Sequence, residues 1–222
     1  MVLKKLFLLS VLVSNIHLLQ AQYSSLATDV SLLRSFTKGS RFWAMGQTIQ
    51  AHYHIAAKTT AYAWVSYYTN GNFENSQRAI GKDSAVMPQQ LSYFTHSTMR
   101  FRQISLGFRH YIKGAYNSET TWNLYGLGGF GLLLIKVTNT PDNPVDTLQY
   151  HVPQQSLPGT QNIVRLTADV GLGVETLLGS GIYVYADART WIQASSFVSP
   201  YLYNNEVPRV LILSAGIRIL FE

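Results

Sequence analysis

The sequence contains no cysteine, which excludes disulfides and a lipid anchor on an amino-terminal cysteine. Charge is also scarce, because Asp, Glu, Lys and Arg make up only 13% of the residues, compared with about 25% in soluble domains. Beyond residue 21, no apolar run approaches the roughly 20 residues that a membrane-spanning helix requires. These absences argue against a disulfide-bonded secreted domain and against a helical membrane protein.

The first residues have the layout of a signal peptide. Two lysines precede a mostly apolar stretch, residues 6–19, which is too short to span a bilayer as a helix. Ala21 provides a small residue before a cleavage site, so we expect a signal peptide at 1–21 and a mature domain at 22–222. The formal net charge of +6, part of which lies in the leader, is too small an excess to indicate nucleic-acid binding.

Residues 214–221 have the pattern of a closing β-strand. Four positions carry the polar, glycine, apolar and aromatic residues that the outer-membrane barrel-assembly machinery recognises in a last strand: Ser214, Gly216, Ile219 and Phe221. Because side chains alternate along a strand, one face of residues 211–221 is apolar, and the other carries Arg218. We expect the first face to contact lipid and the second to face a polar lumen.

Eight segments have strand-like sequences: residues 26–35, 42–57, 60–68, 98–112, 122–137, 162–177, 182–194 and 209–221. Short links, such as 178–181, alternate with longer ones, chiefly 69–97, 138–161 and 195–208. Outer-membrane barrels have short periplasmic turns and long extracellular loops. We therefore predict an all-β fold, an eight-stranded antiparallel up-and-down transmembrane β-barrel.

From the polar faces of the last three segments, we place four charges in the lumen: Asp169, Asp187, Arg189 and Arg218. We expect them to form a hydrogen-bonded charge network in the lumen, because eight strands leave an interior that side chains just fill. A tight hairpin centred on Gly179 would place Asp169 opposite Arg189, within reach of a salt bridge. The sequence does not decide which face of segments 60–68 and 122–137 points into the lumen. In segment 122–137, the glycines fall on both faces.

In strand number, turn lengths and the closing octet, nearly the whole mature chain resembles the small outer-membrane β-barrels of the OmpA-transmembrane and OmpX type. The resemblance implies an integral protein of the outer membrane of a Gram-negative cell. It leaves the activity open, because one fold serves many functions.

Two pairs of side chains are candidates for binding. His52 and His54 point the same way from one strand, but two ligands without a nearby carboxylate rarely hold a metal. We expect neither a metal site nor a cofactor. Arg100 and Arg102 are predicted at the extracellular end of their strand, where they would contact lipopolysaccharide phosphates or form a solvated rim.

One sequence feature bears on catalysis. His96 and Ser97 lie where a long loop enters a strand, and Glu74 and Asp83 precede them. Neighbours on a strand point to opposite faces, however, so this Ser and His do not make a nucleophile–base pair. We predict no catalytic residue.

We interpret the chain as a monomeric outer-membrane barrel with a filled lumen and a structural or surface-recognition role through loops 69–97 and 138–161. Its expected partners are outer-membrane lipid and lipopolysaccharide, the barrel-assembly machinery, and an extracellular or envelope partner. Two other classes remain open, a lipid-modifying outer-membrane enzyme and a soluble periplasmic barrel that binds an apolar ligand.

Overall fold

The computed structural model describes residues 24–119, 122–153, 155–195, 199–203 and 207–221. The expected signal peptide, 1–21, lies outside these residues. Within them the chain forms strands β1 (Ser24–Ser35), β2 (Trp43–Ala56), β3 (Thr59–Tyr68), β4 (Gly71–Gly81), β5 (Gln90–Lys113), β6 (Asn123–Pro141), β7 (Tyr150–His151), β8 (Gly159–Gly179), β9 (Ile182–Gln193) and β10 (Val210–Phe221). The described part of the chain has no helix that is long and apolar enough to cross a membrane.

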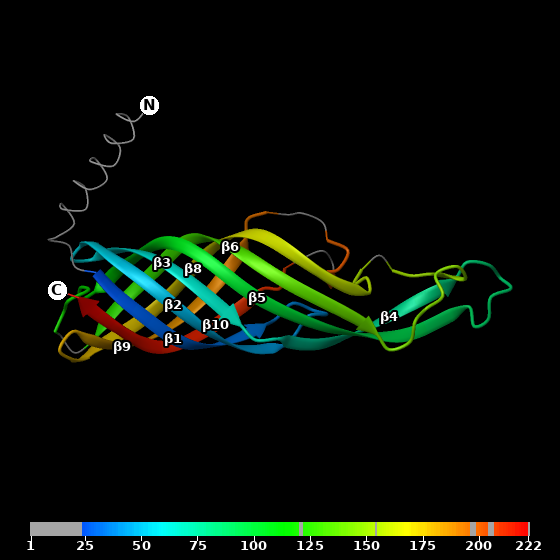
Figure 1. Ribbon diagram of the computed structural model, residues 1–222, viewed down its shortest axis with the longest axis horizontal. Coiled ribbons are helices and arrows are strands. Elements are labelled where there is room, and N and C mark those ends of the chain that lie inside the picture. The colour runs from blue at the N-terminus through cyan, green and yellow to red at the C-terminus, as the bar shows by residue number, and fades with distance from the viewer. Residues whose placement is uncertain (1–23, 120–121, 154, 196–198, 204–206, 222) are drawn as a thin grey trace, which may run out of the picture.

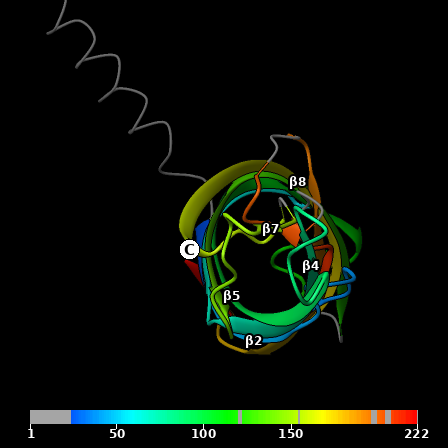
Figure 2. The ribbon, with the colours of Figure 1, turned by 90° about the vertical axis from the view of Figure 1, so that its right-hand side faces the viewer.

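Eight of these strands pair into a closed ring, and Figures 1 and 2 show the resulting barrel from the side and from its end. The order β3-β2-β1-β10-β9-β8-β6-β5 is antiparallel throughout, and pairing of β3 with β5 completes it. The first and last strands meet, with Ser24 opposite Phe221. This confirms the predicted all-β, eight-stranded, up-and-down barrel.

The two ends of the barrel differ. One end, called the turn end, carries Ser24, Phe221 and the short β2–β3, β5–β6 and β8–β9 connections. The longer connections lie at the other, called the loop end, where β4 and the first half of β5 extend well beyond the ring (Figure 1).

The interpretation of residues 69–97 as a loop was wrong for most of that segment. Only two residues separate β3 from β4, and the two strands follow one another along the same neighbour, β5. Tyr67 of β3 lies opposite Arg102, and Gly71 of β4 lies opposite Met99. The pair Asn70-Gly71 therefore continues the strand direction, and β5 is 24 residues long because it has two partners in succession.

The alternation of side chains places apolar residues outside and polar residues inside. On β10, Leu213 and Ile217 are exposed on the outer wall, whereas Arg218 is completely buried. The structure also assigns the two segments whose facing the sequence left open. Trp64 of β3 points inward, and Gly126 and Gly128 of β6 face outward on the same side as the exposed Phe130.

The predicted register of β8 and β9 was wrong by two residues. Asp169 lies opposite Trp191, and Arg189 lies opposite Gly171. The two turn residues are Ser180 and Gly181, whose φ values of 44° and 74° are those of a type I′ hairpin. A turn at these residues alone would move the register by three residues. The β-bulge between Leu177 and Gly179 inserts one extra residue in β8 and brings the difference back to two.

Candidate functional site

A carboxylate near the turn end of the lumen is held by two arginines. Arg218 Nη2 lies 2.6 Å from Glu175 Oε1, and Arg218 Nε lies 3.1 Å from Oε2. Arg109 Nη1 lies 3.4 Å from Oε2, and the Tyr111 hydroxyl donates to Oε1 at 2.9 Å. These side chains are buried, so their charges are compensated by one another and not by bulk water.

A second cluster lies farther along the lumen. Arg189 Nη2 is 2.9 Å from Asp29 Oδ2, and its Nε is 2.8 Å from Asp187 Oδ1. Gln50 and Tyr185 each donate a hydrogen bond of 3.0 Å to the same Asp29 oxygen. One arginine thus bridges two acids that belong to β1 and β9.

Asp169 is bound differently. Its carboxylate accepts hydrogen bonds from Gln103 Nε2 at 2.6 Å, from the Ser105 hydroxyl and from Thr167 Oγ1 at 3.4 Å. The sequence placed this residue opposite Arg189, but β9 presents Trp191 at that position. The structure therefore brings Asp187, Arg189 and Arg218 into ion pairs, while Asp169 lies among neutral donors.

Three members of these clusters were missed at the sequence level: Asp29, Arg109 and Glu175. Each follows from the period-two rule, because each lies next to a residue that faces outward. Phe108 beside Arg109 and Val30 beside Asp29 are both strongly exposed. Glu175 lies on the polar face already assigned to segment 162–177 but was not counted among the lumen charges, and applying the same alternation to the strands of Asp29 and Arg109 would have found the other two.

Apolar layers lie on both sides of the charged clusters. Toward the turn end, Tyr62, Trp64, Tyr111, Tyr125 and Tyr183 belong to one buried cluster. Toward the loop end, a larger cluster includes Phe42, Tyr68, Phe101, Trp191 and Ile212. An interior cavity between these layers measures about 10 Å³, room for one water molecule at most.

The paired histidines of β2 are part of the interior packing. The Ser25 hydroxyl contacts His52 Nδ1 at 3.2 Å and His54 Nε2 at 3.0 Å. The remaining ring nitrogens contact Gln50 and Thr60. This Ser–His contact was not foreseen, and its members are nearly fully buried, so a substrate has no access to it. Among the described residues, no three potential metal ligands come together.

Beyond the barrel, at the loop end, β4 and the first half of β5 form a platform together with residues 142–153 and 155–158. It has a small core of its own: Ala79, Tyr93 and Tyr150 pack with Val86, Leu91, Val145 and Val152. The Tyr93 hydroxyl donates to Gln77 Oε1 at 2.9 Å, and Gln77 Nε2 donates to the carbonyl of Gln155. Burial raises the pKa of the Tyr93 phenol. Residues 142–153 and Gln155 are thus docked onto the hairpin.

The structure separates the Ser and His that the sequence placed side by side. His96 lies on the outer face of β5, with Nδ1 3.0 Å from Glu74 Oε1 and Nε2 2.5 Å from Asp142 Oδ1. Ser97 points to the other face, where its hydroxyl donates to Asn139 Oδ1 at 2.8 Å. The imidazole therefore links β4 to the segment after β6 and does not contact the serine.

Arg100 and Arg102 lie on the outer wall at the loop end. Both guanidinium groups lie within 6 Å of the Tyr67 ring, at 5.9 and 5.7 Å. Arg100 also donates to Asn70 Oδ1 at 2.8 Å and lies opposite Lys136 of β6. Three cations thus share one patch of the wall.

The residues of the predicted assembly signal have different environments in β10. Ser214 is buried and accepts a hydrogen bond from Arg189. A Cβ added to Gly216 would lie 2.1 Å from the carbonyl oxygen of Thr28, so only glycine allows β1 and β10 to approach this closely. Ile219 and Phe221 are exposed on the outer wall.

A closed antiparallel ring with an apolar outer wall and a charged interior is the architecture of a membrane-spanning β-barrel. A soluble barrel would present the charged face to water instead. Fold and surface together define an outer-membrane β-barrel, whose turn end is periplasmic and whose loop end is extracellular.

Comparison with known proteins agrees on the fold. No protein-family model matches the chain, and no curated protein matches it in sequence. Among solved structures, Neisserial surface protein A matches 89% of this chain and 97% of its own, with 12% identity and a TM-score of 0.55. Ail of Yersinia pestis matches 90% of this chain and 99% of its own (12% identity, TM-score 0.49). OprG of Pseudomonas aeruginosa matches 90% and 96% (10% identity, TM-score 0.47). At these identities the likeness to Neisserial surface protein A concerns the fold of a small outer-membrane β-barrel.

Proposed function

We propose that this protein is a monomeric outer-membrane barrel with a closed lumen, which holds an extracellular platform for recognition of a partner at the cell surface. The observation that carries the proposal is the platform itself. A hairpin that extends well past the ring, with its own apolar core and a docked segment, is more than a connection between two strands.

The contacts inside the platform support a recognition role. Backbone hydrogen bonds join Lys82 to Gln149 and Asp142 to Phe94, and Lys82 Nζ donates to the carbonyl of Thr147 at 2.7 Å. Such contacts hold the outer surface in one shape before a partner arrives, which lowers the entropic cost of binding.

Removal of the platform tests the proposal. Gly71 and Met99 lie opposite one another, so a two-residue Asn-Gly turn in place of residues 72–98 would close the β3–β5 edge. Wild type and variant would be treated on intact cells with a membrane-impermeant crosslinker. We expect the variant to assemble as a barrel and to lose the crosslinked products of the wild type. Identical products in both proteins would contradict the proposed role.

The closed lumen has a separate test. The ion pairs of Arg189 and Arg218 and the apolar layers around them favour a filled interior. We expect no steady conductance from the purified protein in a planar bilayer. Large ion currents would contradict closure and would leave the platform proposal untouched.

We further propose that Arg100 and Arg102 contact lipopolysaccharide phosphates, with Lys136 beside them. Three cations on a lipid-facing wall at the extracellular end favour an anionic partner. Replacing Arg100 and Arg102 by Gln should reduce the lipopolysaccharide that copurifies. Arg34→Gln is the matched control, because Arg34 lies at the same end of the barrel and stacks on Trp43. An equal reduction in the control would contradict the assignment.

The proposed role is not catalytic. His96 and Ser97 face opposite sides of β5, and the buried Ser25 is closed off from substrate. The last strand is proposed to carry the assembly signal through Ser214, Gly216, Ile219 and Phe221, with the barrel-assembly machinery as its partner.

A further inference from the structure

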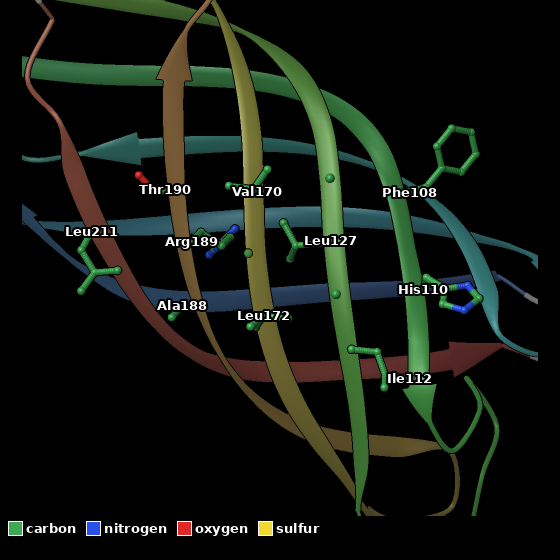
Figure 3. Close-up of a pocket in the computed structure, with 13 residues that line it drawn as sticks. Phe108, His110, Ile112, Leu127, Val170, Leu172, Ala188, Arg189, Thr190 and Leu211 are labelled. Carbon is green, nitrogen blue, oxygen red and sulfur yellow. The ribbon is translucent and has the colours of Figure 1, made fainter.

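The outer wall of the barrel is hollowed where β6 carries glycine. Gly126 and Gly128 face outward and have no side chains to cover the wall. Their neighbours across β5 and β8 are Phe108, His110, Val170 and Leu172. The hollow continues over Ala188 and Thr190 of β9 to Leu211 of β10, and it forms an open groove of about 710 Å³ (Figure 3).

Backbone packing does not require glycine at these two positions. A Cβ added to Gly126 would lie 3.7 Å from Leu172 Cδ2, and one added to Gly128 would lie 3.9 Å from the carbonyl oxygen of Asp169. Both are ordinary van der Waals contacts. Glycine weakens a strand, and where the backbone does not need it, it often marks the close approach of a ligand. The open space is therefore the feature that these glycines provide.

The groove is lined mainly by hydrocarbon groups and lies on the wall that faces the bilayer. Figure 3 shows Phe108 and Ile112 along one side, on β5, and Leu211 at the other side, on β10. Water does not fill such an apolar hollow within a membrane, because it would find too few polar partners. A flexible acyl chain fits the groove, and it gains the dispersion contacts that an empty groove would lack.

A β-bulge places a cation at the periplasmic foot of the groove. Tyr111 faces the lumen, so regular alternation would turn Lys113 inward as well. The bulge between Tyr111 and Lys113 instead leaves both Ile112, which lines the groove, and Lys113 exposed on the outer wall. Lys113 Nζ lies 3.6 Å from the centre of the Trp122 ring. Bulges commonly re-aim a side chain at a functional position.

We propose that the groove binds one acyl chain of an anionic phospholipid of the inner leaflet, whose phosphate-bearing headgroup contacts Lys113. The site opens at the periplasmic end, because Lys113 is the last residue of β5 on the turn side. The inference rests on the barrel spanning the outer membrane and is independent of the platform and of the cations at the extracellular end.

Native mass spectrometry of the purified, folded protein tests the site. The protein would be titrated separately with phosphatidylglycerol and with phosphatidylcholine. Gly128→Leu fills the groove, and Ala215→Leu introduces the same side chain at an exposed position of β10 outside it. Heat-modifiable gel mobility confirms folding, and Gly126→Ala with Gly128→Ala is a milder filling pair if the leucine variant does not fold.

We expect the wild type and Ala215→Leu to retain one phosphatidylglycerol, and the groove-filling variants to lose it. Lys113→Gln should lower the preference for phosphatidylglycerol over phosphatidylcholine about fivefold, the contribution of one lysine near an anionic lipid surface. Lys58→Gln, at another periplasmic turn, should leave it unchanged. Equal retention by wild type and filled variants would overturn the proposal. Three other results would also overturn it. These are an equal loss of phosphatidylglycerol from Ala215→Leu, an unchanged lipid preference in Lys113→Gln, and a dimer of the wild type that the groove-filling substitutions dissociate.

Discussion

Arg218 and Glu175 form a two-point ion pair across the interior of the barrel, with nitrogen–oxygen distances of 2.6 and 3.1 Å. Their strands, β10 and β8, are not neighbours in the ring, because β9 lies between them. The pair therefore links two strands that share no backbone hydrogen bonds, across the strand that separates them.

Removing the carboxylate should be costly. Glu175→Ala would leave Arg218 and Arg109 in the lumen without their shared acid, and such a loss destabilises a protein by about 3–5 kcal/mol. Asp169→Ala is the comparison, because its partners are neutral and an unsatisfied neutral donor costs about 1–3 kcal/mol. Urea unfolding in lipid vesicles measures both, and equal losses would contradict the assigned difference.

The pairing of Arg189 is open to a direct test by two double-mutant cycles of the same unfolding measurement. Asp29→Ala and Arg189→Ala should be coupled by about 0.5–3 kcal/mol, as residues in one ion-pair network are. Asp169→Ala and Arg189→Ala should show the smaller coupling, because Asp169 is held by Gln103 and Ser105. The opposite ranking would restore the register expected from a hairpin centred on Gly179.

A charge on the outer wall should be disfavoured by lipid. Leu213 is half exposed on the wall of β10, and an Arg or Lys at the bilayer midplane costs about 2–4 kcal/mol. Leu213→Arg should lower the urea midpoint and the folded fraction seen by heat-modifiable gel mobility. Ile80→Arg places the same charge on the exposed platform outside the bilayer, where we expect a change within about 0.5 kcal/mol. A loss of the same size in both variants would mean that lipid is not the cause.

Two aromatic residues distinguish an assembly signal from a membrane anchor. Phe221 and Tyr53 both lie opposite Ser24, one on each side of it, so they occupy equivalent places at the periplasmic edge. If Phe221 is part of the assembly signal, Phe221→Ala lowers the amount assembled in cells more than Tyr53→Ala does. Refolding of the two purified variants into lipid vesicles should then be similar. Equal assembly in cells would show that Phe221 is an anchor only.

The alternation of apolar and polar residues along the sequence was enough to predict the barrel. It also predicted which side chains point outward and which point inward on the strands where the alternation is clearest. Leu213 outside and Arg218 inside follow from a period of two, which is a local property of the extended backbone. The connections that follow β6 and β9 were also placed correctly, since the strand-like segments on either side of them were recognisable one by one. Residues 69–97 were not, because β4 and the start of β5 were taken for a loop.

The pairings inside the lumen required the tertiary structure. The turn at Ser180 and Gly181 and the bulge between Leu177 and Gly179 set the register of β8 against β9. A slip of two residues leaves every side chain on the same face, so the alternation does not reveal it. Asp29 and Arg189 are far apart in the chain, and they meet only because β1 and β10 close the ring. Which acid faces which base depends on the stagger of all eight strands.

The sequence by itself determined that the chain is a barrel with an apolar outside and a charged inside, because alternation is set residue by residue. Only the tertiary structure decided that β4 stacks on β3 along β5 to raise a platform, and that the glycines of β6 leave an open groove in the wall. Both features arise from neighbours across strands, and those neighbours are fixed by the register of a closed ring.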